Sequence, residues 1–151
     1  MLGLLFSLLG DIFLVLKKEK FVEGLLSFLI AHLFYAYAVL NDSQFQFTPF
    51  IFVLSILYYI IFSKLLFNKS GSKKYYILIY GLVITFLLWQ SFERAYFIGN
   101  EITIRFAAGI LLFIISDSVL AYNKFVRKFN LAQLVILSTY YTAQLLIALS
   151  V

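Results

Sequence analysis

Six continuous apolar runs, separated by short polar segments, dominate the chain. The runs are close to the roughly 20 residues that a transmembrane helix needs, and they lack the alternation typical of outer-membrane strands. The pattern predicts an all-α fold: a polytopic membrane bundle of six transmembrane helices with short loops, forming a single domain over residues 1–151. The predicted helices are Met1–Leu16, Phe21–Leu40, Pro49–Phe67, Tyr75–Phe92, Ile102–Tyr122 and Leu131–Val151.

The amino-acid composition also indicates a membrane protein. Hydrophobic residues make up 64% of the chain and charged residues 13%, whereas a soluble domain carries about 25% charged residues. This excludes a soluble enzyme, a disordered tail and a nucleic-acid-binding domain, so the expected partner is membrane lipid and not nucleic acid. The chain has no cysteine and one histidine, which disfavours a disulfide, a thiolate nucleophile or a zinc site. No cofactor and no metal are expected.

The distribution of basic residues predicts the orientation. The first, third and fifth connections, with the helix end before the third, hold ten of the twelve lysines and arginines, and only Arg94 and Arg105 lie on the other side. By the positive-inside rule these connections are cytoplasmic and both termini lie outside. Glu93 and Glu101 are expected to join the two arginines in an outer-surface cluster. The ten basic residues of the predicted cytoplasmic side are Lys17, Lys18, Lys20, Lys64, Lys69, Lys73, Lys74, Lys124, Arg127 and Lys128. Cysteine-free, short-looped sequence rich in Phe, Ile, Lys and Asn suggests a bacterial inner membrane.

Two aspartates lie inside predicted membrane helices. Asp11 precedes Lys17 by six residues, and Asp117 precedes Lys124 by seven. At 1.5 Å per residue, both carboxylates lie about 9–11 Å in from the cytoplasmic ends of two helices that run in the same direction. An ionisable residue at such depth is costly and marks a candidate functional site. Each aspartate alone could equally be a satisfied hydrogen-bond partner between helices, but their matching depth favours a functional pair.

Further polar residues accompany this pair. Ser7 lies one turn before Asp11, and Ser116 and Ser118 flank Asp117. Such hydroxyls can hydrogen-bond a neighbouring carboxylate between closely packed membrane helices. The remaining aromatic stripes of 49–67 and 75–92 are expected to face lipid or to pack between helices.

The second and the last predicted helices also carry deep polar side chains. His32 lies about 18 Å from the start of its helix, near the bilayer centre, with Tyr35 on the same stripe. It is either a neutral, hydrogen-bonded core residue or part of a site. Tyr140 and Tyr141 are too deep for the interfacial aromatic belt and share a face with Gln144. They either cap hydrogen bonds between helices or line a cavity.

Four motifs in order make the chain resemble the YhhN family of membrane proteins. That family includes lysoplasmalogenases, which cleave the vinyl ether bond of lysoplasmalogens to a fatty aldehyde and a glycerophospho-ethanolamine or -choline. The motifs are LLFSLLGD at 4–11, FLIAHLFY at 28–35, GILLFIISDS at 109–118 and TYYTAQLLI at 139–147. The resemblance implies that the family's signature positions are Asp11, His32, Tyr35, Ser116, Asp117, Tyr140 or Tyr141, and Gln144. Family members usually carry about two helices ahead of the first motif, so we expect this chain to be a shortened form.

The resemblance also implies a chemistry for the aspartate pair. Vinyl ether hydrolysis begins with protonation of the β-carbon, and water then adds to the cation that results. An acid and a negative group that steadies the cation and activates water are both required, and glycosidases meet a similar demand with two carboxyl groups. Asp11 and Asp117 are therefore the expected catalytic pair for a lysoplasmalogen substrate. The expected orienting residues are Ser7, His32, Tyr35, Ser116, Ser118, Tyr140, Tyr141 and Gln144. Head-group phosphate contacts are expected from Lys17, Lys18, Lys124 and Arg127.

A function of another class remains an alternative. Sliding the sequence by 106 residues aligns Asp11 with Asp117 and Lys18 with Lys124, a faint sign of a parallel repeat. Secondary transporters are often built from such repeats. A small proton-coupled membrane transporter that uses the same aspartate pair is therefore the second hypothesis. It predicts uptake of an unchanged solute, whereas the hydrolase predicts release of an aldehyde.

Overall fold

The computed structural model describes residues 1–16 and 20–150, and these residues form an all-α bundle. The prediction of an all-α fold is confirmed for this part of the chain. A short 3-10 turn, Gly71–Lys73, connects α3 to α4. The helices are α1 (Leu2–Val15), α2 (Phe21–Ser43), α3 (Pro49–Phe67), α4 (Lys74–Ile98), α5 (Glu101–Phe125) and α6 (Ala132–Ala148).

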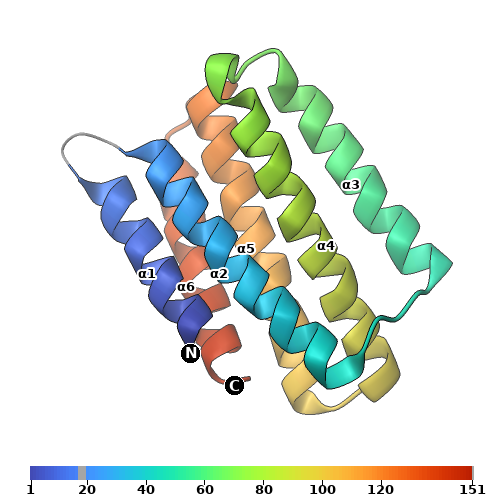
Figure 1. Cartoon of the computed structure of the whole chain (residues 1–151). Coiled ribbons are helices and arrows are strands. Elements are labelled where there is room, and N and C mark those ends of the chain that lie inside the picture. Colours follow the sequence, from blue (N-terminus) through green and yellow to red (C-terminus); the bar gives the residue numbers. More distant parts are fainter. Residues whose placement is uncertain (17–19, 151) are drawn as a thin grey trace.

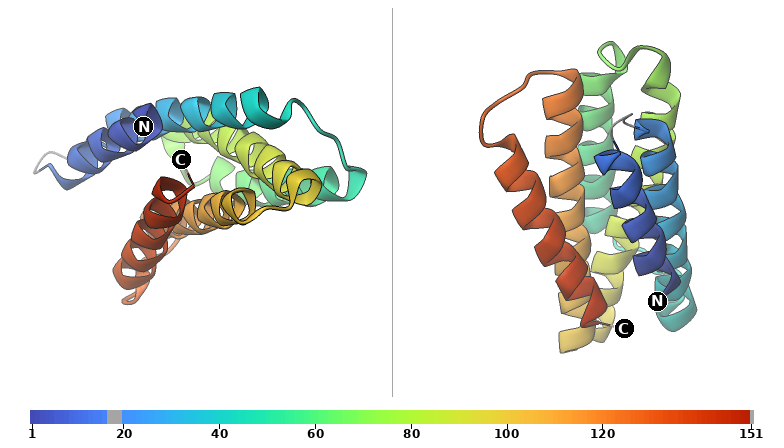
Figure 2. Two further views of the ribbon diagram at one scale, coloured as in Figure 1. Left: turned by 90° about the horizontal axis from the view of Figure 1, so that it is seen from below. Right: turned by 90° about the vertical axis from the view of Figure 1, so that its left-hand side faces the viewer.

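Helix α4 occupies the middle of the bundle. It packs against α2, α3 and α5, while α1 packs mainly on α2 and α6 mainly on α5. Seen along the bundle, α1 and α2 form one wall, α5 and α6 form the other, and the first and last helices face each other across the gap (Figure 2). The start of α1 and the end of α6 lie together at one end of the bundle, and the α3–α4 and α5–α6 connections lie at the other (Figure 1).

Four helices are long and apolar enough to cross a membrane: α2, α3, α5 and α4 together with the preceding turn. Together with the composition, they identify the chain as an integral membrane protein. The two remaining helices are shorter. With 14 residues in α1 and 17 in α6, they are about 21 and 26 Å long, against a hydrocarbon core of about 30 Å.

Local sequence explains where the helices begin and end. Pro49 opens α3, as predicted, because its missing N–H is not needed there. Helix α4 runs six residues beyond the predicted end at Phe92 and ends at Gly99, which adopts a left-handed φ of 65°. Asn100 then caps α5 by accepting a hydrogen bond from the Thr103 N–H at 2.8 Å. The apolar pattern therefore locates the helices, but polar helix ends extend them.

The extended end of α4 buries a carboxylate. Glu93 is fully buried, so its expected place in an exposed outer cluster is wrong. Its Oε1 accepts hydrogen bonds from the Thr48 N–H at 2.6 Å and the Trp89 Nε1–H at 2.8 Å, and its Oε2 accepts one from the Thr48 hydroxyl at 2.6 Å. These bonds attach the α2–α3 connection to α4. The neighbouring Arg94 pairs with Asp42 at 2.5 Å.

Glycine allows α5 and α6 to approach closely. A Cβ at Gly109 would lie 2.9 Å from the Ile147 Cγ1 and 3.1 Å from the Ala143 carbonyl oxygen, closer than ordinary contact. At Gly81 on α4, by contrast, a Cβ would first meet the Tyr59 ring at 3.5 Å, which is an ordinary contact. Small residues at such crossings are typical of membrane helix packing.

We expect Gly109→Ala to destabilise the bundle by about 1–3 kcal/mol, because overpacking forces the two backbones apart. Gly81→Ala is the matched control. It gains up to about 1 kcal/mol of helix propensity and meets no obstruction. Thermal unfolding of both purified variants in detergent measures the difference. Equal midpoints for the two variants would contradict the close approach of α5 and α6.

Candidate active site

Asp11 and Asp117 line one pocket between α1, α5 and α6. The pocket has a volume of about 300 Å³ and lies near the ends of α1 and α5 and the start of α6. The two carboxyl groups, 106 residues apart in sequence, thus come to the same pocket. The pocket also has an apolar rim from α1, α2 and α6. Its other polar lining residues are Ser116, Gln133, Tyr140 and Tyr141.

Tyr140 holds the first of these carboxylates. Its hydroxyl donates a hydrogen bond to Oδ2 of Asp11 at 2.7 Å and accepts one from Nε2 of Gln144 at 2.9 Å. Tyr140 is buried, whereas Tyr141 is 65% exposed and stands at the pocket edge. The structure therefore distinguishes the two adjacent tyrosines, and the bond joins the first helix of the bundle to the last.

Tyr80 holds the second carboxylate, and the sequence analysis did not single it out. Its hydroxyl donates a hydrogen bond to Oδ2 of Asp117, and its side chain is buried. Tyr80 lies in the aromatic stripe of α4 that was expected to face lipid or to pack. The phenolic group at membrane depth was the one available signal, because a buried hydroxyl needs a hydrogen-bond partner.

Aromatic rings fix the positions of both tyrosines. The rings of Phe28, Phe113 and Tyr140 pack edge to face, with centroids 5.3–6.0 Å apart. His32 extends this cluster, with its ring centroid 4.7 Å from Phe113 and 5.4 Å from Tyr80. His32 is fully buried, and neither ring nitrogen has a hydrogen-bonding partner among the described residues. It therefore packs behind the site, against Tyr80, and does not line the pocket that holds the aspartates.

The remaining predicted site residues lie at three different places. Ser116 lines the pocket, but its hydroxyl donates to the Ile136 carbonyl at 3.1 Å. Ser118 hydrogen-bonds with Tyr58 at 2.8 Å, on the side of α5 that faces α3. Ser7 is buried one turn before Asp11. Tyr35 lies away from the aspartates, beside a separate hollow near the chain ends.

Two of the four candidate phosphate ligands, Lys124 and Arg127, lie at the end of the bundle nearest the aspartates. Lys17 and Lys18 lie outside the described residues. Lys124 lies near the end of α5 with its Nζ 4.8 Å from the Phe21 ring centroid. Arg127 follows α5 and borders a shallow hollow at the same end.

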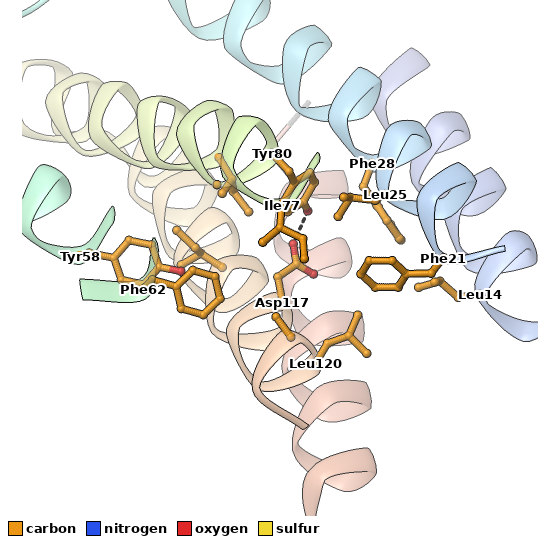
Figure 3. Close-up of a pocket in the computed structure, with 14 residues that line it drawn as sticks. Leu14, Phe21, Leu25, Phe28, Tyr58, Phe62, Ile77, Tyr80, Asp117 and Leu120 are labelled. Atoms are coloured by element: carbon orange, nitrogen blue, oxygen red, sulfur yellow. Dashed lines mark hydrogen bonds between the residues drawn. The ribbon is translucent and has the colours of Figure 1, made fainter. Parts of the chain in front are cut away.

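A second, more apolar pocket adjoins the first. It lies between α1, α2, α3, α4 and α5, has a volume of about 40 Å³, and shares Leu14, Phe28, Asp117 and Leu120 with the first pocket. Figure 3 shows the Asp117 carboxylate and the Tyr80 hydroxyl joined at its centre, with aromatic and aliphatic side chains on both sides. Asp117 therefore faces a polar and an apolar space.

The arrangement can support proton transfer. Two interacting carboxyl groups in an apolar setting resist ionising together, so one can act as acid while the other acts as base. Each is oriented by a tyrosine from a neighbouring helix. Within residues 1–16 and 20–150, no group of three or more His, Asp or Glu side chains could hold a metal ion.

Comparison with known proteins identifies the family of this chain. The model of the YhhN family matches residues 1–151. The chain is 35% identical to the human protein named lysoplasmalogenase TMEM86A, over 98% of this chain and 62% of that protein. It is 36% identical to mouse lysoplasmalogenase TMEM86B, over 98% of this chain and 61% of that protein. The chain thus spans about three fifths of the length of these relatives. No solved structure matches it significantly. Because the family model matches residues 1–151, the chain belongs to the YhhN family.

Proposed function

We propose that this protein is a membrane hydrolase that cleaves the vinyl ether bond of lysoplasmalogen. The products are a fatty aldehyde and a glycerophospho-ethanolamine or -choline. The observation that carries the proposal is the pair of carboxyl groups, Asp11 and Asp117, at one pocket inside a bundle of apolar helices. The relatives named lysoplasmalogenase support the reaction class.

The two aspartates divide the acid and base work. One carboxylic acid protonates the vinyl ether, and the other carboxylate steadies the developing cation and activates water. Tyr140 and Gln144 orient Asp11, and Tyr80 orients Asp117. His32 acts indirectly, because it packs against the Tyr80 ring. The lysolipid head group lies toward the basic end of the bundle, where Lys124 and Arg127 lie.

We expect Asp11→Asn and Asp117→Asn each to lower kcat by about 10²–10⁴-fold, the usual contribution of a general acid or base. An amide is close to the carboxyl group in shape but takes no part in proton transfer at neutral pH. The assay is aldehyde release from lysoplasmalogen by purified protein in detergent, and thermal unfolding confirms that each variant is folded. Near-normal turnover in either folded variant would remove that residue from the mechanism.

The same protein in sealed vesicles tests the rival function. A proton-coupled transporter would accumulate an unchanged solute when a pH gradient is applied. The hydrolase needs no gradient and leaves an aldehyde. Uptake without chemical change, in wild-type protein that releases no aldehyde, would replace the proposal.

We expect Tyr80→Phe to lower kcat by roughly tenfold or more with little change in KM. The substitution removes one hydrogen bond to a carboxyl group, a bond worth about 1.5–3 kcal/mol when its partner is charged. Tyr59→Phe is the matched control, because Tyr59 donates only to the Leu78 carbonyl, at 3.3 Å. Equal kinetics for the two variants would show that the Tyr80 hydroxyl has no role in turnover.

We also propose that all six helices cross a bacterial inner membrane with both termini outside. The basic α3–α4 and α5–α6 connections lie at one end of the bundle, and the start of α1 and the end of α6 lie at the other (Figure 1), which supports this orientation. The short α1 and α6 can be accommodated by local thinning of the bilayer.

The absence of cysteine makes this orientation directly testable. In right-side-out vesicles, we expect an impermeant maleimide to label Asn41→Cys, at the exposed end of α2, before the vesicles are opened. Ser72→Cys, in the exposed turn between α3 and α4, should label only after opening. The opposite pattern would reverse the orientation.

A further inference from the structure

The apolar pocket beside Asp117 has the character of a hydrocarbon-binding site. It is lined mainly by aliphatic and aromatic side chains from five helices, as small-molecule pockets usually are. Its polar lining side chains are Tyr58, Tyr80 and Asp117. Tyr58 bonds to Ser118, and Tyr80 bonds to Asp117 itself. The polar groups are thus paired with one another, and the rest of the wall suits an alkyl chain.

The two pockets together match the two halves of a lysolipid. The first pocket has six polar lining residues, whereas the second is apolar, and both lie toward the same end of the bundle. They meet at Leu14, Phe28, Asp117 and Leu120, which line both. A molecule that places a polar head in the first pocket and a chain in the second must pass these four residues.

The order of atoms in a vinyl ether then assigns the two acids. From head to tail the substrate runs glycerol oxygen, α-carbon, β-carbon and chain. Along the path from the polar to the apolar pocket, the β-carbon is the last of the three atoms of the vinyl ether. It therefore lies at the boundary between the pockets, beside Asp117, which lines both. Asp11 lines only the polar pocket, where the ether oxygen and water belong.

Resting on the function proposed above, we infer that the apolar pocket binds the alkenyl chain of the substrate and that Asp117 is the acid that protonates the β-carbon. Protonation leaves a cation shared by the α-carbon and the ether oxygen. Water adds to the α-carbon and gives its proton to Asp11. The hemiacetal then collapses: its C–O bond to glycerol breaks, Asp11 protonates the leaving oxygen, and Asp117 takes the hydroxyl proton. One water is consumed, and both carboxyl groups return to their starting state.

Ala121→Leu tests the chain site, because Ala121 lines the apolar pocket on α5 and a larger side chain shortens the space there. Ala148→Leu makes the same change at an exposed position of α6 and is the matched control. We expect Ala121→Leu to lower kcat/KM for a long-chain lysoplasmalogen roughly tenfold or more, and to leave a short-chain one nearly unchanged. Ala148→Leu should change neither. Equal effects on both chain lengths, or no effect, would overturn the chain assignment. Ala121→Val is a milder narrowing if Ala121→Leu fails to fold.

A binding measurement separates failure of this inference from failure of the proposed function. A lysolipid with a saturated ether chain has no double bond to protonate. We expect its long-chain form to raise the unfolding temperature of the wild-type protein and of Ala148→Leu more than that of Ala121→Leu. If wild-type protein releases no aldehyde but this difference appears, the reaction fails and the chain site stands. If aldehyde is released but the difference is absent, the chain site fails.

The pH dependence of residual turnover tests the assignment of the acid. Turnover that needs a protonated acid falls as the pH rises, and turnover that needs a carboxylate base falls as the pH is lowered. We expect Asp11→Asn to keep the fall at high pH and to lose the fall at low pH, and Asp117→Asn to show the reverse. Aldehyde release by both variants across the pH range measures the difference. The opposite pattern, or the same pH profile in both variants, would overturn the assignment.

Discussion

A carboxyl group among membrane helices has to find its hydrogen-bond donors within the protein, because the hydrocarbon around the bundle offers none. In this protein each aspartate finds a tyrosine on another helix. Asp11 on α1 meets Tyr140 on α6, and Asp117 on α5 meets Tyr80 on α4. These two bonds link four of the six helices at one depth. The edge-to-face rings of Phe28 and Phe113 and the buried His32 keep the tyrosines in place.

The same two bonds create the asymmetry that the proposed chemistry requires. Asp117 stands where a polar and an apolar pocket meet, and Asp11 belongs to the polar pocket alone. Two aspartates that look equivalent in depth therefore face different surroundings. An amphipathic lipid has the same division along its length, so the fold can align the reacting bond by matching head to polar pocket and chain to apolar pocket.

Both aspartates and both tyrosines lie within the stretch that matches the family model, residues 1–151. The relatives named lysoplasmalogenase are longer, and this chain corresponds to about 61–62% of their length. The shared part therefore contains the whole hydrogen-bonded arrangement described here.

The sequence by itself determined the all-α class, the approximate place of each helix and the positions of the two aspartates along their helices, because apolar run length and helical rise act locally. The sequence pattern located the end of α4 too early and predicted an exposed Glu93. The hydrogen bonds that Glu93 accepts from Thr48 and Trp89 depend on how the α2–α3 connection folds back onto α4. The sequence also could not distinguish Tyr80 from Tyr76, which is 46% exposed on the same helix. Only the rotation of α4 against α5 decides which tyrosine reaches a carboxylate. The tertiary structure likewise decided that Asp117 borders two pockets, since side chains from five helices must converge to form them.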